Sequence, residues 1–429
     1  MHGRDVVITG MGLISPLGRT VGENWAHMKL LKTGITRYPR KGMPAAFECL
    51  GKVSELTLPG DIPQKISGQL KFLNRGALLG FTAAYEAATA AAFQLSNILP
   101  RRRSLYIASG DFTKVGYDFL YPAIKDASRN NGREIDYEKL NESALSKVNP
   151  FFLLESLSNN LFSFLSAYLE CMGPNTSLSS LSPCGGYALE LAARSIRQNK
   201  ADIAVAVGYG NWITDIPLFE LGELGIVSRC RDGVHSFRPF DRRRDGFITG
   251  EGGAALVLEA SESAEKRGAV IRGRVRGTAN CIEFTSANGF TVPPLVSRRC
   301  INMALENAGS SIRDLAFITP HGSGTQKGDA SELQSAAKVF EEAGHQVPVC
   351  AMKSYTGHLG AASDIAEVIL GVMAVKESIA PATLNFAEAD PAYAGLMIAG
   401  THQSTHKCTF LSTSYGVGGQ SSSVVVEAT

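Results

Sequence analysis

One cysteine stands in a sequence context that favours nucleophilic chemistry. Cys184 follows Ser182–Pro183, which ends an extended segment, and precedes Gly185–Gly186, which permits a tight turn into the Ala-rich segment 187–198. We expect the thiol at a helix N-terminus, where unpaired amides and the helix dipole favour a thiolate and can hold an oxyanion. The pattern predicts an acidic, reactive thiol, and a buried structural cysteine is the alternative interpretation.

Two of the eight histidines lie in matching Gly-rich turns. His321, in TPHGSGTQKGD, follows an expected strand, and His358, in KSYTGHLGAAS, lies between an expected strand and a helix, five residues after Lys353. Open α/β sheets place their sites at the carboxyl ends of strands, so we expect both imidazoles to converge on Cys184. Lys353 is expected either to organise the electrostatics around His358 or to form an ion pair with Glu367.

A thiolate, two imidazoles and a lysine together favour one reaction class. The thiolate can take an acyl group as a thioester. The imidazoles can then donate to the carbonyl oxygen of a second thioester while its carboxylate leaves as CO₂. A hydrolase needs only one histidine with an orienting acid or amide. Because the histidines and cysteines lack metal-ligand spacing, no metal is expected. These residues therefore predict a decarboxylative Claisen condensation.

The elements that position these residues form a duplicated α/β pattern. DGFITGEGGAALVLEA (245–260) resembles TSYGVGGQSSSVVVEA (413–428), and an extended segment, a small-residue turn and an Ala-rich helix precede each. We predict two halves, 1–260 with the cysteine and 261–429 with the histidines. The expected strands are Val6–Thr9, Leu105–Ala108, Ile203–Val207, Ala254–Glu259, Ala316–Thr319, Val349–Met352 and Ser422–Glu427. The expected helices are Phe72–Leu95, Tyr187–Gln198, Val296–Ala308, Ala330–Ala343 and Ala361–Lys376.

Composition excludes several function classes. The 429 residues are 44% hydrophobic and 19% charged with a net charge of +2, an ordinary globular balance that does not indicate a nucleic-acid partner. No apolar run approaches the roughly 18 residues that cross a bilayer, and the N-terminus lacks the pattern of a secretory signal. We expect a cytoplasmic protein without a membrane partner. The eight cysteines lack CxxC spacing and are expected to be free thiols.

Taken in order, the motifs resemble those of the β-ketoacyl-acyl-carrier-protein synthases, the elongating ketosynthases of type II fatty acid and polyketide synthesis in the thiolase superfamily. The resemblance runs through VVITGMGLISPLG (6–18), GPNTSLSSLSPCGGYAL, FRPFDRRRDGFITGEGGAALVLE, HGSGTQKGD, KSYTGHLGAAS, PATLNF and SYGVGGQ. It implies an α/β, thiolase-like fold whose duplicated halves form five αβαβα layers. It also implies a homodimer or a heterodimer with a chain-length-factor-like subunit, and no cofactor, since the substrates are carried on the phosphopantetheine of an acyl carrier protein.

The resemblance assigns roles at matching positions. Cys184 falls at the nucleophile, His321 and His358 at the catalytic histidines, and Lys353 at the family's catalytic lysine. The oxyanion hole corresponds to the backbone amides of Cys184 and Val417. The residues expected to bind phosphopantetheine or substrate are Ser323, Thr325, Phe112, Tyr415 and Val417. Carrier proteins of such pathways are typically acidic, and the basic residues expected to dock one are Lys65, Lys71 and Arg75.

Two departures concern acyl selectivity. Pro183–Cys184–Gly185 replaces the usual Ala-Cys-Ala/Ser, and Gly416–Val417–Gly418–Gly419 replaces Gly-Phe-Gly-Gly, whose Phe gates the acyl pocket. We expect a wider pocket mouth, unless Tyr415 or Phe112 fills the space, and a specialised polyketide, polyene or fatty acid pathway. Two alternatives stay open: a chain-length-factor-like partner subunit, which would lack the nucleophile, and a ketosynthase-like acyltransferase that forms C–O or C–N bonds.

Overall fold

A computed structural model describes residues 3–40, 43–110, 117–152, 157, 159–180, 182–285 and 291–429, and Phe112 lies outside these ranges. Its main sheet has nine strands in the order β11-β14-β15-β10-β1-β9-β8-β4-β7. The strands of the first half are β1 (Val6–Ile14), β4 (Arg103–Ser109), β7 (Asn175–Ser179), β8 (Ile203–Asn211) and β9 (Glu251–Ala260). Those of the second half are β10 (Gly273–Ile282), β11 (Leu315–Thr319), β14 (Thr409–Tyr415) and β15 (Gln420–Ala428).

The two halves repeat one strand topology. In the first, β4 is parallel to β7 and β8, while β9 is antiparallel to β8 and β1. In the second, β11 is parallel to β14 and makes a parallel bridge between Ile318 and Val349, while β15 is antiparallel to β14 and β10. Antiparallel pairing of β1 with β10 joins the halves. The predicted duplication is confirmed, whereas the exact boundary at 260/261 stays a prediction.

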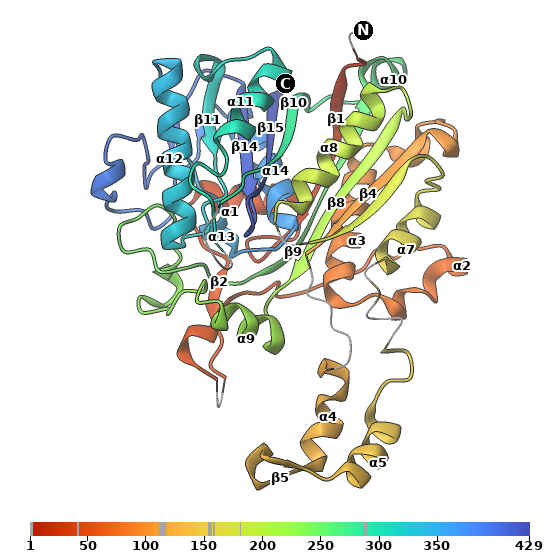
Figure 1. Cartoon of the computed structure of the whole chain (residues 1–429). Helices are drawn as coiled ribbons and strands as arrows, with labels where there is room; N and C mark the ends of the chain where they lie inside the picture. Colours follow the sequence, from red (N-terminus) through yellow and green to blue (C-terminus); the bar gives the residue numbers. More distant parts are fainter. Residues whose placement is uncertain are drawn as a thin grey trace.

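Helices complete five layers. The longer helices of the first half are α1 (Val21–Lys29), α3 (Arg75–Ala90), α7 (Asn160–Tyr168), α8 (Cys184–Arg197) and α9 (Asp215–Glu223). Those of the second half are α11 (Arg298–Ala308), α12 (Gln326–Ala343) and α14 (Ala362–Lys376). Because α8 and α14 each contact strands of both halves, they form the central layer. On the outer faces α3 and α7 cover the first half-sheet, and α11 covers the second with α12 beside it (Figure 1). The structure thus has the predicted αβαβα architecture.

Smaller elements connect these layers. Three two-stranded ribbons are β2 (Ile35–Arg37) with β3 (Cys49–Gly51), β5 (Ser128–Arg129) with β6 (Glu134–Ile135), and β12 (Ile379–Ala380) with β13 (Gln403–Ser404). The remaining α-helices of the described residues are α2 (Gln64–Ser67), α4 (Tyr117–Ala127), α5 (Tyr137–Lys147), α10 (Ser261–Lys266) and α13 (Lys353–Thr356). Helices α4 and α5 pack together with β5 and β6 in an arm that extends from the body of the molecule (Figure 1).

Side-chain caps and glycines explain where key helices begin and end. Thr325 accepts a hydrogen bond from the Gly328 amide, which caps the first turn of α12. Helix α12 ends at Ala343, and Gly344, which follows it, adopts a left-handed conformation (φ 59°) that favours glycine. In the described residues, no helix combines the length and apolarity that a membrane crossing demands.

Glycines let the first strand of each half approach its covering helix closely. A Cβ at Gly12 of β1 would lie 1.9 Å from the Ala83 carbonyl oxygen of α3, and a Cβ at Gly277 of β10 would lie 2.3 Å from the Ala304 carbonyl oxygen of α11. Neither backbone can move without disturbing a close-packed layer. The same contact in both halves is a further trace of duplication.

We therefore expect Gly12→Ala and Gly277→Ala each to destabilise the fold by about 1–3 kcal/mol, the usual cost of overpacking. The control is Gly60→Ala, because a Cβ at Gly60 meets nothing within 4 Å. Thermal unfolding followed by circular dichroism tests this expectation. Unfolding of all three variants at the parental midpoint would show that the strand–helix contacts are looser than described.

Candidate active site

Cys184 is the first residue of α8, as predicted, and its side chain is only 1% exposed. The next two amides, those of Gly185 and Gly186, donate to Oδ2 of Asp364 in α14 at 3.0 and 3.3 Å. Among the described residues, the amide of Cys184 itself has no hydrogen-bond partner. The first turn of α8 therefore keeps one free N–H group beside the thiol.

The expected acidity of this thiol is wrong. Burial, together with charge repulsion from the nearby Asp364 carboxyl, raises the pKa of Cys184 to about 12. A helix N-terminus favours an anion through its free amides, and here a carboxylate already takes two of them. The resting thiol is therefore protonated at neutral pH.

The two predicted histidines meet. Nε2 of His321 lies 3.2 Å from Nε2 of His358, and both side chains are buried. The Gly360 amide donates to Nδ1 of His358 at 3.2 Å, which assigns the ring proton to Nε2, so His358 donates to His321. Burial, reinforced by the Lys353 charge, holds the pKa of each histidine well below its usual range. Both imidazoles are therefore neutral.

Lys353 anchors the His321 loop rather than the His358 side chain. Its ammonium, 1% exposed, donates to the His321 carbonyl oxygen at 2.7 Å and to Oε1 of Glu367 at 2.8 Å. This confirms the expected ion pair with Glu367. From α12, Glu332 accepts the amides of His321 and Gly322 at 2.7 and 2.8 Å. Buried charges thus fix the backbone that carries His321.

Aromatic rings hold the imidazoles from outside. Trp212 stacks on His358 with ring centroids 4.6 Å apart, and Phe247 packs on the same ring at 5.0 Å. The ring of Tyr415 meets His321 at 4.8 Å, while its hydroxyl lies 3.1 Å from Oγ of Ser323. Sequence reasoning missed the roles of Trp212, Phe247, Glu332 and Asp364. Phe247 lies within the motif RDGFITGEG, and Glu332 lies three residues after the motif HGSGTQKGD. Sequence spacing alone, however, does not show which residues touch the histidines.

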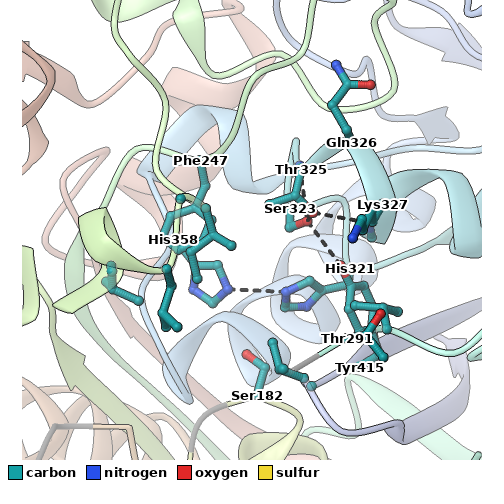
Figure 2. A pocket seen from close by; sticks show the side chains of 18 of the residues that line it. Ser182, Phe247, Thr291, His321, Ser323, Thr325, Gln326, Lys327, His358 and Tyr415 are labelled. Carbon is teal, nitrogen blue, oxygen red and sulfur yellow. Dashed lines mark hydrogen bonds between the residues drawn. The ribbon is translucent and has the colours of Figure 1, made fainter. Parts of the chain in front are cut away.

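These side chains border a cavity of about 420 Å³ (Figure 2). The predicted residues His321, Ser323, Thr325, His358, Tyr415 and Val417 line it together with Ser182, Trp212, Leu221, Leu224, Gly225, Ile226, Asp245, Phe247, Thr291, Val292, Gln326, Lys327, Gly328 and Gly416. Ser323 lies 2.8 Å from the Thr325 hydroxyl. The structure therefore brings the predicted tunnel residues and the histidines to one cavity.

The final loop of the chain abuts the turn that carries the cysteine. A Cβ at Gly416 would lie 2.1 Å from the Ser182 carbonyl oxygen, so the two backbones are in direct contact. Among the described residues, the Val417 amide has no hydrogen-bond partner, and its side chain is 40% exposed. Two free amides, of Cys184 and Val417, therefore come from adjoining segments.

The three predicted docking residues lie elsewhere. None of them lines the cavity. Arg75 donates to both carboxylate oxygens of buried Glu251, and Lys71 lies over the rings of Phe72 and Phe151. Lys65 is exposed on α2. Docking by these residues stays a prediction, and Arg75 in addition holds a buried carboxylate in place.

Within the described ranges, no group of three or more His, Cys, Asp or Glu side chains could hold a metal ion. The cysteines of those ranges are free thiols, as expected. The cavity wall includes both imidazoles and Ser182, whereas Cys184 lies two residues beyond Ser182 and is not part of that wall.

Comparison with known proteins decides the family. The N-terminal domain model of β-ketoacyl synthases matches residues 3–264 and the C-terminal domain model matches residues 274–387. The chain belongs to the β-ketoacyl synthase family. It is 27% identical to 3-oxoacyl-[acyl-carrier-protein] synthase 2 of Coxiella burnetii, with 99% of each chain covered. As the predicted family resemblance indicated, this synthase is an enzyme of the acyltransferase class.

Solved structures agree with this assignment. A β-ketoacyl synthase from Burkholderia phymatum superposes with a TM-score of 0.84 at 25% identity, covering 99% of this chain and 100% of that one. The complex AntDE:AntF, a type II PKS acyl-carrier protein with its ketosynthase bound to the hexaketide, contains a chain that superposes with a TM-score of 0.82 at 25% identity. This second comparison covers 100% of each of the two chains. The thiolase-like ketosynthase fold is thus shared over the whole length.

The ion pair of Lys353 yields a stability prediction for the synthase. Lys353→Met should destabilise by about 3–5 kcal/mol, because Glu367 then stays buried without its cation. Adding Glu367→Gln should recover much of that loss. Burial already raises the pKa of Glu367 to about 8, so its unpaired carboxyl binds a proton readily. A proton removes the buried charge, so the deficit of Lys353→Met should shrink as pH falls and grow as pH rises above the usual glutamate range.

Thermal unfolding of the parent, both single variants and the double variant across that pH range measures the coupling. A deficit that is equal in Lys353→Met and in the double variant would show that Glu367 does not depend on Lys353.

Proposed function

We propose that this synthase catalyses a decarboxylative Claisen condensation between an acyl group held on Cys184 and a malonyl group held on an acyl carrier protein. The observation that carries the proposal is the pair of neutral imidazoles, whose Nε2 atoms lie 3.2 Å apart. Both line a cavity whose wall also includes Ser182, two residues before Cys184. One histidine would serve a hydrolase, whereas two directed at one point suit an enolate oxygen.

In the first half-reaction, Sγ of Cys184 attacks the acyl thioester. The S–C bond to Cys184 forms, the bond to the pantetheine sulfur breaks, and the thiol proton leaves with the pantetheine thiol. The free amides of Cys184 and Val417 are placed to donate to the carbonyl oxygen as it gains negative charge. This step does not require the histidines.

In the second half-reaction, the malonyl carboxylate leaves as CO₂ and its bonding electron pair passes to the thioester as an enolate. The Nε2–H group of His358 donates to the enolate oxygen, whereas His321, whose Nε2 accepts from His358 in the resting enzyme, donates from Nε2 only as the tautomer that carries its proton there. Because both pKa values lie well below the usual histidine range, the rings stay neutral donors at physiological pH. The enolate carbon then attacks the acyl thioester, and Cys184 departs as a thiolate that takes up a proton.

We further propose that the hydroxyls of Ser323 and Thr325 bind the phosphopantetheine arm, so that the substrates arrive covalently carried and no cofactor is needed. Both hydroxyls line the cavity, and Tyr415 holds Ser323 in place. The half-exposed Val417 leaves a wide mouth at the final loop, where a phenylalanine gate is expected in the family. This supports acyl chains longer or more rigid than a gated pocket accepts, as in type II polyketide or specialised fatty acid synthesis.

The dimer partner is proposed to add to the free edge of the sheet. β7 is the last strand beyond β4, and its side chains are alternately exposed and half-buried. An exposed edge strand pairs readily with another chain. The adjacent arm exposes large apolar side chains: Leu120, Tyr121, Tyr137 and Leu145. A second copy, or a chain-length-factor-like subunit, fits this surface. Since this chain keeps Cys184 and both histidines, it fits the catalytic subunit.

A basic groove next to the cavity is the surface that best fits an acidic carrier protein. This groove of about 880 Å³ shares Gly225, Asp245 and Gln326 with the cavity. Its wall includes Arg229 and Arg231, which have no ion-pair partner among the described residues. The sequence-based candidates Lys65, Lys71 and Arg75 line neither the groove nor the cavity. A carrier protein bound at this groove would therefore lie next to the cavity that contains the histidines, unlike one bound at Lys65, Lys71 and Arg75.

The roles of the histidines predict a split between the two half-reactions. His321→Ala and His358→Ala should still form acyl-enzyme on Cys184, because loading uses the thiol and backbone amides. Condensation should fall by about two or more orders of magnitude, the usual scale for such donors. Intact-mass detection of the acyl group measures loading, and release of CO₂ with β-ketoacyl product measures condensation. Parental condensation rates in both variants would refute the proposal.

The docking proposal predicts which charges matter. Reversal of Arg229 and Arg231 to Glu should raise the KM for carrier-bound substrate in a salt-dependent way, with little change for a small pantetheine thioester. The matched variant reverses Lys65 and Lys71 to Glu and should change neither KM. A larger KM increase in that second variant would place docking on the surface around α2 instead. Equal losses with both substrates would indicate misfolding.

A further inference from the structure

Two thiols meet in the outer layer of the second half, between β10 and α11. Cys281 is the last residue but one of β10, and Cys300 is the third residue of α11. The Cys300 thiol donates to the Ala279 carbonyl oxygen at 3.2 Å, and it is also within hydrogen-bonding reach of the Cys281 sulfur. Because Ala279 and Cys281 share one face of the strand, both contacts belong to the same strand–helix packing. The two sulfurs are therefore direct neighbours.

The surroundings of the pair make the two thiols unlike. The hydrogen bond from Cys300, together with the positive charge of Arg299, lowers the pKa of Cys281 to about 7 against the opposing effect of burial. The same hydrogen bond and burial raise the pKa of Cys300. Glu283, a carboxylate at this contact, is bonded to Arg299 at 2.7 Å. At neutral pH the pair thus holds a partly ionised thiol beside a protonated one, the arrangement in which one sulfur reacts first and the other resolves.

The more acidic thiol is also the one nearer to solvent. Cys281 is 6% exposed and Cys300 is fully buried. Sγ of Cys281 lies 3.6 Å from Sδ of Met303, and both Met303 and the adjacent Ile282 are exposed. A methionine side chain is unbranched and flexible, so a small oxidant reaches Cys281 by displacing it.

We propose that Cys281 and Cys300 form a dithiol site that hydrogen peroxide oxidises to a disulfide. The Cys281 thiolate attacks one peroxide oxygen: the S–O bond forms, the O–O bond breaks, and the other oxygen leaves as hydroxide that takes up a proton. The Cys300 sulfur then attacks the Cys281 sulfur. The S–S bond forms, the S–O bond breaks, and water leaves with the thiol proton of Cys300. Two thiols are oxidised by two electrons as the peroxide is reduced to two water molecules.

The site lies next to the support of the final loop. The Glu283 amide donates to the Gly419 carbonyl oxygen, and Arg299 donates to the Ile282 carbonyl oxygen at 2.7 Å. These bonds already join the end of β10 to the start of α11 and to the loop that carries Val417. The disulfide would make the junction between β10 and α11 covalent. This inference does not depend on the proposed condensation.

The test exposes the whole synthase to hydrogen peroxide at neutral pH, blocks the remaining thiols and maps the peptides by mass spectrometry. A Cys281–Cys300 disulfide should form while circular dichroism stays unchanged, and dithiothreitol should reverse it. In Cys300→Ser, where the resolving thiol is lost, a sulfenic acid should persist on Cys281 and be captured by dimedone. Cys300→Ala serves if that variant does not fold.

The matched control is a second pair within the same chain. The thiols of Cys49 and Cys230 are also within hydrogen-bonding reach of each other, but burial raises the pKa of both, that of Cys230 to about 12. This pair should oxidise at least about tenfold more slowly, because the thiolate is the reactive form. Oxidation of Cys49–Cys230 as fast as Cys281–Cys300 would overturn the inference. So would the absence of the Cys281–Cys300 disulfide, or a disulfide of Cys281 with any other cysteine.

Discussion

Burial of two helices, α8 and α14, between the half-sheets is the constraint on which the site depends. Each helix contacts strands of both halves, and their N-terminal ends meet at Gly185 and Asp364. Such a layer must be close-packed, and glycines make this possible: a Cβ at Gly208 or Gly210 of β8 would lie 2.5 Å from a carbonyl oxygen of the segment that leads into α14. That segment, held against β8, follows His358 directly. Packing of the central layer therefore fixes the positions of both Cys184 and His358.

The same packing buries several ionisable side chains, and each of them is stabilised by hydrogen bonds to a partner side chain or to backbone amides. Lys353 bonds Glu367, while Glu332 and Asp329 each accept backbone amides. Burial raises the pKa of Glu332 to about 8 and that of Asp329 to about 6, so these carboxyls gain protons more readily than exposed ones. The hydrogen bonds that Glu332 and Asp329 accept from backbone amides fix the loop from His321 to Gly324. Rigid loops with neutral imidazoles provide donors that need no rearrangement as charge develops.

Sequence patterns predicted the layered fold and the residues of the cavity because both depend on local features. Apolar runs and Gly-rich turns identified β1, β4, β8, β9, β11 and β15, and all five expected helices occur. The strands β10 and β14 were missed because Arg274 and Arg276 interrupt the first, and buried serines and a threonine occupy the second. The extended segment expected before Cys184 contains β7, a polar edge strand. Expected strand Val349–Met352 forms only a bridge to Ile318. Contacts such as Trp212 on His358 join distant segments, which no local spacing records.

The thiol shows most clearly why local geometry was insufficient. The Cys-Gly-Gly turn does place Cys184 at a helix N-terminus, and an isolated helix end would favour a thiolate. Charge at that end, however, depends on what occupies the amides, and the occupant lies about 180 residues away in the other half of the duplication. The halves therefore contribute unlike parts to one helix end: the first supplies the nucleophile, and the second supplies the carboxyl that accepts the next two amides. Since acyl transfer from a thioester releases the thiol proton to the departing sulfur, a protonated resting cysteine remains compatible with the proposed turnover.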